Sequence, residues 1–211
     1  MAEGITRPTT PSTGTGRWRV VDIVVGALLA VAGGVLFWAW SNGVYPPLSA
    51  GLIAAYAPLG GLISGGWVLP AVLGGLIIRK PGAALFVETV AATGELLMGS
   101  PYGTTVLISG IVQGLGAELV FAAFRYRRFT LPVAGLAGAG AGLFMGLNDC
   151  FAPWGWNIAY ELGDKFAYIG CTVASGIVIA GLVSWLATRG LAKTGALSSF
   201  ASRRAATEPV L

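Results

Sequence analysis

The stretch RKPGAALFVETVAATGELLMGS, residues 79–100, decides how the rest of the chain is interpreted. Two cations open it, and an apolar run suited to a membrane-spanning helix follows. Glu88 and Glu95 interrupt that run seven residues apart, so they share one face of a helix. An ionisable side chain is costly inside a membrane and by default indicates function. The stretch therefore predicts a spanning helix whose acidic face points into a bundle.

The composition of the whole chain also indicates a membrane protein. Of its 211 residues, 10% are charged and 33 are glycine, and the mean hydropathy is +0.76. Soluble domains average about 25% charged residues, and glycine suits helices that pack closely in lipid. We therefore expect lipid to be the main solvent of this chain.

Several classes of function are excluded by residue content. The net charge is +4, but the cations are scattered between apolar runs and form no basic face interleaved with aromatics, so no nucleic acid is expected as a partner. The sequence has no histidine, which removes the usual base of hydrolytic triads and common metal ligands. Cys150 and Cys171 either form a disulfide or are two small buried thiols. We expect no enzymatic activity, no metal and no cofactor.

Six segments are apolar enough and long enough to cross a bilayer, which takes about 20 residues. They are residues 20–40, 56–78, 82–99, 103–124, 131–150 and 166–188. The prediction is an all-α bundle of six transmembrane helices over residues 17–190, in the cell membrane, with flexible tails at 1–16 and 191–211. Residues 48–55 are too short to cross alone and form an outer cap or a re-entrant turn, unless the chain has seven spans.

The distribution of lysine and arginine distinguishes six spans from seven. With six spans and a cytoplasmic N-terminus, every lysine and arginine except Lys165 lies on the inner side, as the positive-inside rule requires. Seven spans would place Arg125, Arg127 and Arg128 outside. We therefore predict six spans with both termini in the cytoplasm.

Tryptophan and tyrosine gather near the predicted outer boundary. The residues concerned are Trp38, Trp40, Tyr45, Tyr102, Trp154, Trp156 and Tyr160. An interfacial belt explains such residues without any ligand, but a belt occupies both faces of the membrane. The inner face has little beyond Trp18, Tyr126 and Trp185, and this asymmetry favours a binding site that faces outward.

Other polar residues within or at the ends of the spans have two interpretations each. Gln113 lies near the middle of the fourth span, and Glu118 in its inner half either pairs with an arginine such as Arg125 or has a functional role. Asn148 and Asp149 end the fifth span on the outer side, where they line a pocket or cap the helix end.

Small residues recur at intervals of four in three of the spans. These rows are Gly26, Ala30 and Gly34 in the first span, Gly110 and Gly114 in the fourth, and Gly138 and Gly142 in the fifth. Rows of this kind let two helices approach closely. We expect contacts within the bundle, with docking to a partner subunit as the alternative for the first span.

Two blocks of the sequence resemble the YkoE-type substrate-binding component of energy-coupling factor (ECF) transporters. The first block runs from Arg79 through Glu88 and Glu95 to Ser100, and the second is SGIVQGLGAELVF, residues 109–121. The resemblance extends from about Trp18 to Trp185. It implies a six-helix protein that binds a thiamin-related vitamin or its hydroxymethylpyrimidine precursor from outside.

The resemblance also implies partners. A separate transmembrane coupling protein and paired cytoplasmic ATPases drive release inward, with reorientation of the binding protein among its membrane lipids. Other members of the wider class dock the coupling protein on an alanine-x-x-x-alanine row, and Gly26, Ala30 and Gly34 take that place here. The chain itself has no phosphate-binding loop, so it does not hydrolyse ATP alone.

The side chains fit such a ligand. A carboxylate accepts a hydrogen bond from the amine of an aminopyrimidine, and the thiazolium cation of thiamin suits aromatic faces and buried acids. The hypothesis is that Glu88 and Glu95 are the acceptors. Secondary candidates for the wall of the site are Trp38, Trp40, Tyr56, Trp67, Gln113 and Asn148.

Two other functions compete with this one. A self-contained ion-coupled carrier would use Glu88, Glu95 or Glu118 as a proton relay, but such carriers are typically built from internal repeats, and the sequence has none. A structural membrane subunit would bind no small molecule, and its acids would only pair helices.

Overall fold

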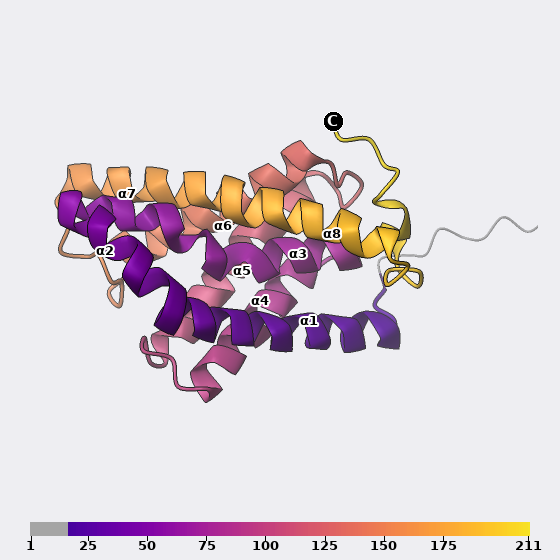
Figure 1. Ribbon diagram of the computed structural model, residues 1–211, viewed down its shortest axis with the longest axis horizontal. Helices are drawn as coiled ribbons and strands as arrows, with labels where there is room; N and C mark the ends of the chain where they lie inside the picture. Colours follow the sequence, from indigo (N-terminus) through magenta and orange to yellow (C-terminus); the bar gives the residue numbers. More distant parts are fainter. Residues whose placement is uncertain (1–16) are drawn as a thin grey trace, which may run out of the picture.

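The computed structural model describes residues 17–211, and in that range the chain is helical with no β-strand. The predicted flexible tail at residues 1–16 lies outside the described residues. The α-helices are α1 (Val20–Ala39), α2 (Tyr45–Ala55), α3 (Leu69–Ile78), α4 (Ala83–Leu97), α5 (Thr105–Ala123), α6 (Leu131–Phe151), α7 (Leu162–Ser175) and α8 (Val183–Lys193). The other helical segments are η1 (Trp40–Val44) and η3 (Gly176–Leu182), which are π-helical, and η2 (Ala57–Val68) and η4 (Ala201–Arg204), which are 3-10 helices. Figure 1 shows them as one elongated bundle.

The predicted all-α membrane bundle is confirmed. Five helical stretches of the described chain are long and apolar enough to cross a membrane: Val20–Ala55, Ala57–Ile78, Thr105–Ala123, Leu131–Phe151 and Leu162–Lys193. The remaining predicted span, residues 82–99, corresponds to α4, whose 15 residues extend about 22 Å at 1.5 Å per residue. This length falls short of a hydrocarbon core of about 30 Å. Contacts with α1, α3 and α5 surround α4 and hold it inside the bundle.

The first helix is longer than predicted and bends. α1, η1 and α2 form one helical path of 36 residues, with Pro46 and Pro47 in the first turn of α2. Proline has no amide hydrogen, so carbonyls one turn earlier lose their α-helical donors, and the wider π turn of η1 accommodates the break. In Figure 1, α2 bends from the axis of α1 toward α7, where Tyr56 donates a 2.6 Å hydrogen bond to Asp164. Residues 48–55 therefore belong to a bent helix and form neither a re-entrant turn nor a separate span.

The second span changes helix type halfway. Its first half is η2, where glycines allow close packing: a Cβ at Gly65 would lie 2.5 Å from the carbonyl oxygen of Ser175. The hydroxyl of Ser175 also accepts a 2.8 Å hydrogen bond from the amide of Gly65. α3 then starts at Leu69 with Pro70 in its first turn. The start of a helix leaves backbone N–H groups without intrahelical partners, and here it lies in the middle of a span.

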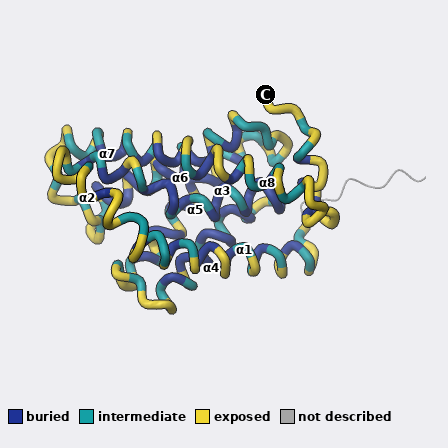
Figure 2. The backbone as a smooth tube through the Cα atoms, viewed as in Figure 1, coloured by how far each residue is buried: buried dark blue, intermediate teal, exposed yellow. Residues whose placement is uncertain are grey.

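Small residues bring the helices together, as the sequence predicts. A Cβ at Gly34 would lie 3.0 Å from the carbonyl oxygen of Ala91 in α4, and one at Gly138 would lie 2.0 Å from that of Gly176 in η3. Gly26 and Ala30 are also buried, and Gly26 packs on Phe86 of α4. The row in the first span thus faces α4 inside the bundle, and does not present a free surface to a partner subunit. In Figure 2 the buried backbone follows α3, α5 and α6 through the middle of the bundle.

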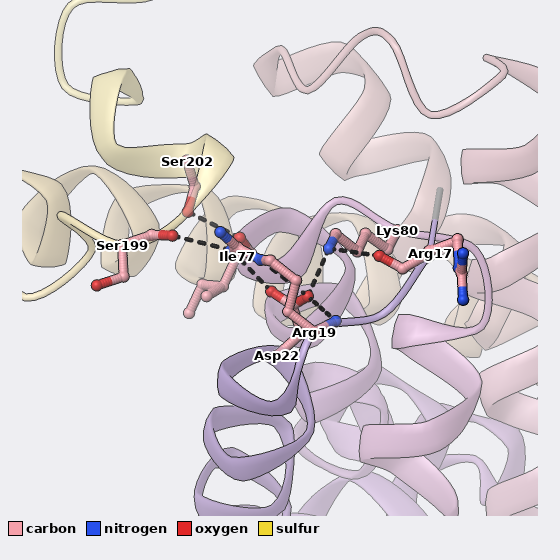
Figure 3. A network of polar contacts seen from close by, with 7 residues as sticks. All are labelled: Arg17, Arg19, Asp22, Ile77, Lys80, Ser199 and Ser202. Carbon is pink, nitrogen blue, oxygen red and sulfur yellow. Dashed lines mark hydrogen bonds and ion pairs between the residues drawn. The ribbon is translucent and has the colours of Figure 1, made fainter. Parts of the chain in front are cut away.

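One end of the bundle carries the predicted inner cations of the described chain, and we call it the basic end. Its residues are Arg17, Arg19, Arg79, Lys80, Arg125, Arg127, Arg128, Arg189, Lys193, Arg203 and Arg204. There Asp22, fully buried at the start of α1, accepts hydrogen bonds from Arg19 and from Lys80, which follows α3. Figure 3 shows these side chains together with Ser199 and Ser202 from the C-terminal segment. Lys80 also donates to the carbonyl of Arg17 at 2.8 Å. The network ties the start of α1 to the end of α3.

The predicted flexible tail at residues 191–211 is not observed: residues 191–193 end α8, and the C-terminal segment, residues 194–211, packs against the bundle. Leu197 and Phe200 are buried in an apolar cluster with α1, α3 and α4. Ser202 donates to the carbonyl of Ile77 at 2.8 Å. Glu208 binds Arg79 through both oxygens at 2.6 and 2.7 Å. The prediction failed because two isolated apolar residues in a Gly/Ser/Ala-rich stretch carry no helical periodicity; their partners come from other helices. We call this segment the C-terminal strap.

Glu118 has a structural role that differs from the arginine pairing considered above. Its carboxylate accepts hydrogen bonds from the amides of Gly82 at 2.6 Å and Ala84 at 2.9 Å, at the start of α4. The hydroxyl of Tyr126 donates to it at 2.7 Å. Negative charge at a helix N-terminus is favourable because the unpaired amides carry partial positive charge. Glu118 thus caps α4 from α5.

Candidate ligand-binding site

A cavity of about 200 Å³ opens at the end of the bundle opposite the basic end. Its walls come from α1, α2, η2, α4, α5, α6 and α7 and from the loops that follow α4 and α6. The bend of α2 places Tyr45 and Ile53 in the wall, so α2 closes one side of the cavity. A mostly apolar cavity with a few converging polar groups is the usual form of a small-molecule site.

Glu95 is the first polar group of the cavity. It lies in the last turns of α4, is fully buried from solvent, and lines the cavity. Its Oε1 accepts hydrogen bonds from the hydroxyls of Ser41 at 2.7 Å and Ser100 at 3.1 Å. Its Oε2 is buried and has no hydrogen-bond partner. Because an unsatisfied buried oxygen is costly, this atom is a candidate acceptor for a donor on a ligand.

Asp149 is the second polar group, near the end of α6. Its Oδ2 accepts a 3.0 Å hydrogen bond from the hydroxyl of Tyr168 in α7, and its Oδ1 accepts one from Asn148 at 3.2 Å. Asn148 is held in turn by Trp154, whose indole N–H donates to its Oδ1 at 3.0 Å. Both Asp149 and Tyr168 line the cavity. Unlike Glu95, Asp149 has a donor on each oxygen.

Aromatic rings connect the surroundings of the two acids. The ring of Trp67 lies 4.6 Å from that of Tyr45 and 5.7 Å from that of Tyr102. Tyr102 then contacts Trp156 at 5.1 Å between ring centroids. Trp67 also donates a 2.9 Å hydrogen bond to Ser41, the serine that binds Glu95. The result is a continuous aromatic wall, which we define as Tyr45, Trp67, Tyr102 and Trp156.

The electrostatics of the cavity are negative. In the described part of the chain, the ion pairs join only Asp22 and Glu208 to cations, so neither cavity acid has a lysine or arginine within 4.0 Å. Tyr102, in the loop after α4, is affected by the same negative charge. Its pKa lies above the usual value because of burial, and because Tyr45, Glu95 and Asp149 are nearby. A cationic or amine-bearing ligand suits such a cavity.

A metal ion does not fit the groups present. Among residues 17–211, no three His, Cys, Asp or Glu side chains lie close enough to hold a metal ion. Cys150 and Cys171 are both free thiols. The chemistry available is therefore hydrogen bonding, charge and aromatic contact.

The structure brings three of the eight predicted site residues to the cavity wall. Glu95, Trp67 and Gln113 line it. Asn148 lies behind the wall, where it supports Asp149 and donates to Ser109 at 3.2 Å.

The other four predicted residues lie elsewhere. Trp40 packs against Gly66 and donates to the carbonyl of Ile63 at 3.1 Å. Trp38 and Tyr56 are exposed side chains outside the lining. Glu88 is fully buried and outside the lining, and its Oε2 accepts a 2.7 Å hydrogen bond from the amide of Ala71.

The contact between Glu88 and Ala71 indicates what Glu88 does. Ala71 lies in the first turn of α3, at the point where the second span changes from η2 to an α-helix. Glu88 therefore compensates the N-terminus of a helix that begins inside the membrane, as Glu118 does for α4. Its Oε1 has no partner. The shared helical face of Glu88 and Glu95 is real, but their surroundings differ.

Several lining residues were not predicted as part of the site. Among them are Tyr45, Tyr102, Ser109, Asp149, Trp156, Tyr160 and Tyr168. Four of them were visible in the sequence as outer aromatics, and Asp149 as a residue for which a pocket was one of two interpretations. No sequence signal identified Tyr168, because it enters the site only through the packing of α7 against α6.

A protein family, a relative and a solved structure resemble the chain. A family model described as "ABC-type cobalt transport system, permease component" matches residues 21–144. The "Putative HMP/thiamine permease protein YkoE" of Bacillus subtilis (strain 168) is 36% identical over 186 residues, which cover 87% of this chain and 89% of that protein. A solved structure described as "Crystal structure of an S-component of ECF transporter" has a TM-score of 0.77 and 34% identity, covering 88% of this chain and 91% of the other.

Proposed function

The chain belongs to the family of YkoE-type substrate-binding components of ECF transporters, and we propose that its cavity binds thiamin or the hydroxymethylpyrimidine precursor. As a substrate-binding component it is a multi-pass membrane protein of an ATP-driven importer and not an enzyme. Family membership sets aside the self-contained carrier and the purely structural subunit considered from the sequence.

One observation carries the ligand proposal: the unpartnered Oε2 of Glu95 in an aromatic-lined cavity. An aminopyrimidine presents an exocyclic amine, and that amine donates to a carboxylate oxygen. Thiamin and hydroxymethylpyrimidine share this group. Trp67 lies near Glu95, because it donates a hydrogen bond to Ser41, which binds Glu95. A flat ring held by Glu95 therefore has an aromatic face available.

The distribution of charge between the two ends of the bundle indicates which side of the membrane the cavity faces. Within residues 17–211, the basic end carries nearly all the cations, and such an end is expected in the cytoplasm under the positive-inside rule. The cavity then opens outward. The partners expected for this component are a transmembrane coupling protein and cytoplasmic ATPases, which supply the energy for inward release. The small-residue row of α1 packs against α4, so docking requires another face.

Binding by the purified protein tests the proposal. Thiamin and hydroxymethylpyrimidine are titrated in a calorimeter against the wild-type protein and Glu95→Gln. The substitution replaces a charge-assisted hydrogen bond of about 1.5–3 kcal/mol by a neutral one of about 0.5–1.5 kcal/mol, so we expect both ligands to bind about five- to tenfold more weakly.

Glu161→Gln is the matched control. Glu161 is an exposed acid that precedes α7 at the cavity end and lies outside the lining, so this variant should bind like the wild type. Unchanged affinity of Glu95→Gln for both ligands would remove Glu95 from the site. If the wild-type protein binds neither ligand, the proposed substrate itself is wrong.

A further inference from the structure

The two acids of the cavity present different chemistry to a ligand. Glu95 has one oxygen engaged by two hydroxyls and one oxygen open. Asp149 has both oxygens engaged, one by Tyr168 and one by Asn148. A donor on a ligand finds an oxygen with no partner at Glu95, whereas each oxygen of Asp149 already has one donor and its charge is what stays uncompensated.

The charge of Asp149 has no compensating cation among the described residues. Within residues 17–211, the ion pairs involve other acids, and the nearest cation along the chain, Lys165, lies over the ring of Phe151 at 4.9 Å. A buried charge without a partner is unfavourable. A ligand that places positive charge near Asp149 would therefore stabilise the cavity.

The surroundings of Asp149 suit a cation that has no N–H group. Tyr160 and Tyr168 line this side of the cavity, with ring centroids 6.2 Å apart. Trp156, on the loop after α6, continues the wall toward Tyr102. Aromatic faces attract delocalised cations without a hydrogen bond, and Asp149 adds charge nearby.

We propose that Asp149 is a specificity-determining residue that selects ligands with a permanent cationic ring, and that it orients them with that ring at Asp149 and the aminopyrimidine at Glu95. This inference rests on the proposed function, since it assumes an aminopyrimidine ligand. Thiamin has both groups: its thiazolium ring is cationic and has no N–H donor. Hydroxymethylpyrimidine has only the aminopyrimidine and therefore binds at Glu95 alone. The site then distinguishes thiamin from its precursor through Asp149.

Three ligands and two variants test the assignment by calorimetry. The ligands are thiamin, hydroxymethylpyrimidine, and a thiophene analogue of thiamin in which an uncharged ring of the same shape replaces the thiazolium. Wild-type protein should bind thiamin at least about tenfold more tightly than the thiophene analogue. In Asp149→Asn that preference should fall below about threefold, while affinity for hydroxymethylpyrimidine changes by less than about twofold.

Glu161→Gln is the matched control, because Glu161 is another acid at the cavity end that is exposed and lies outside the lining. It should preserve the preference for thiamin. Equal weakening of all three ligands by Asp149→Asn would overturn the inference, as would a wild-type protein that binds thiamin and the thiophene analogue alike. Failure of the wild type to bind any of the three refutes the proposed substrate instead.

A second measurement keeps the test decisive if Asp149→Asn does not fold. In Glu95→Gln, thiamin and hydroxymethylpyrimidine should both bind more weakly, but the preference for thiamin over the thiophene analogue should persist. Loss of that preference in Glu95→Gln would place the charge selection at Glu95 and overturn the assignment to Asp149.

Discussion

Removing the cap that Glu118 places on α4 should destabilise the bundle without changing its ligand site. Glu118→Ala leaves the amides of Gly82 and Ala84 without the carboxylate that now lies 2.6 and 2.9 Å away. An orphaned buried donor costs about 1–3 kcal/mol. The Gly82 amide is only partly buried, so water recovers part of its loss. The expected total is about 2–4 kcal/mol.

This loss converts into a measurable change of the unfolding midpoint. For chains of 150–250 residues, 1 kcal/mol corresponds to about 2–4 °C, so Glu118→Ala should lower Tm by about 5–15 °C. Tryptophan fluorescence during heating of the detergent-solubilised protein gives Tm. Glu118→Gln keeps an oxygen acceptor, so its Tm should lie between those of the wild type and Glu118→Ala.

Two controls separate the cap from other roles of Glu118. Tyr126→Phe removes one hydrogen bond to the carboxylate but leaves the cap, so a decrease of about 2–4 °C is expected. Arg125→Ala removes an exposed side chain that has no hydrogen bond to Glu118, and Tm should stay within about 2 °C. If Arg125→Ala is as destabilising as Glu118→Ala, helix pairing through arginine is the correct account. Ligand affinity at low temperature should be unchanged in all four variants.

Two further predictions concern the C-terminal strap and the packing of α6. Glu208→Gln breaks the ion pair with Arg79 and should weaken the attachment of the strap by about 1–2 kcal/mol. The rate of trypsin cleavage after Arg203 and Arg204 should then rise about 5–30-fold; an unchanged rate would contradict the proposed attachment. Gly138→Ala places a Cβ 2.0 Å from the carbonyl oxygen of Gly176 and should prevent recovery of monodisperse protein on gel filtration, whereas Gly170→Ala, with open space around its Cα, should purify like the wild type.

Much of the architecture was available from the sequence because it depends on local features. Apolar length predicts the spans, and the cations predict which ends lie together. The bend of α2 was less accessible. Pro46 and Pro47 indicate a break, but the direction of the bend depends on the contact between Tyr56 and Asp164, which are far apart in sequence.

The candidate site was partly predictable for the same reason. Glu95 stood out because an acid within a span is costly. Glu88 stood out equally, and its different role follows from the break between η2 and α3, which apolarity alone does not reveal. Tyr168 looks like an ordinary residue of an apolar span, and only the packing of α7 against α6 brings its hydroxyl to Asp149.

The partners of the four acids divide them into two pairs with different tasks. Glu88 and Glu118 accept hydrogen bonds from backbone amides at the starts of α3 and α4, so helix N-termini compensate their charge inside the protein. Glu95 and Asp149 accept only from side chains and line the cavity. A proton relay would require all the acids along its path to gain and lose protons, and doing so at Glu88 or Glu118 would remove the compensation that these helix starts need. The acids left for a ligand are the two in the cavity, one as an acceptor and one as a charge.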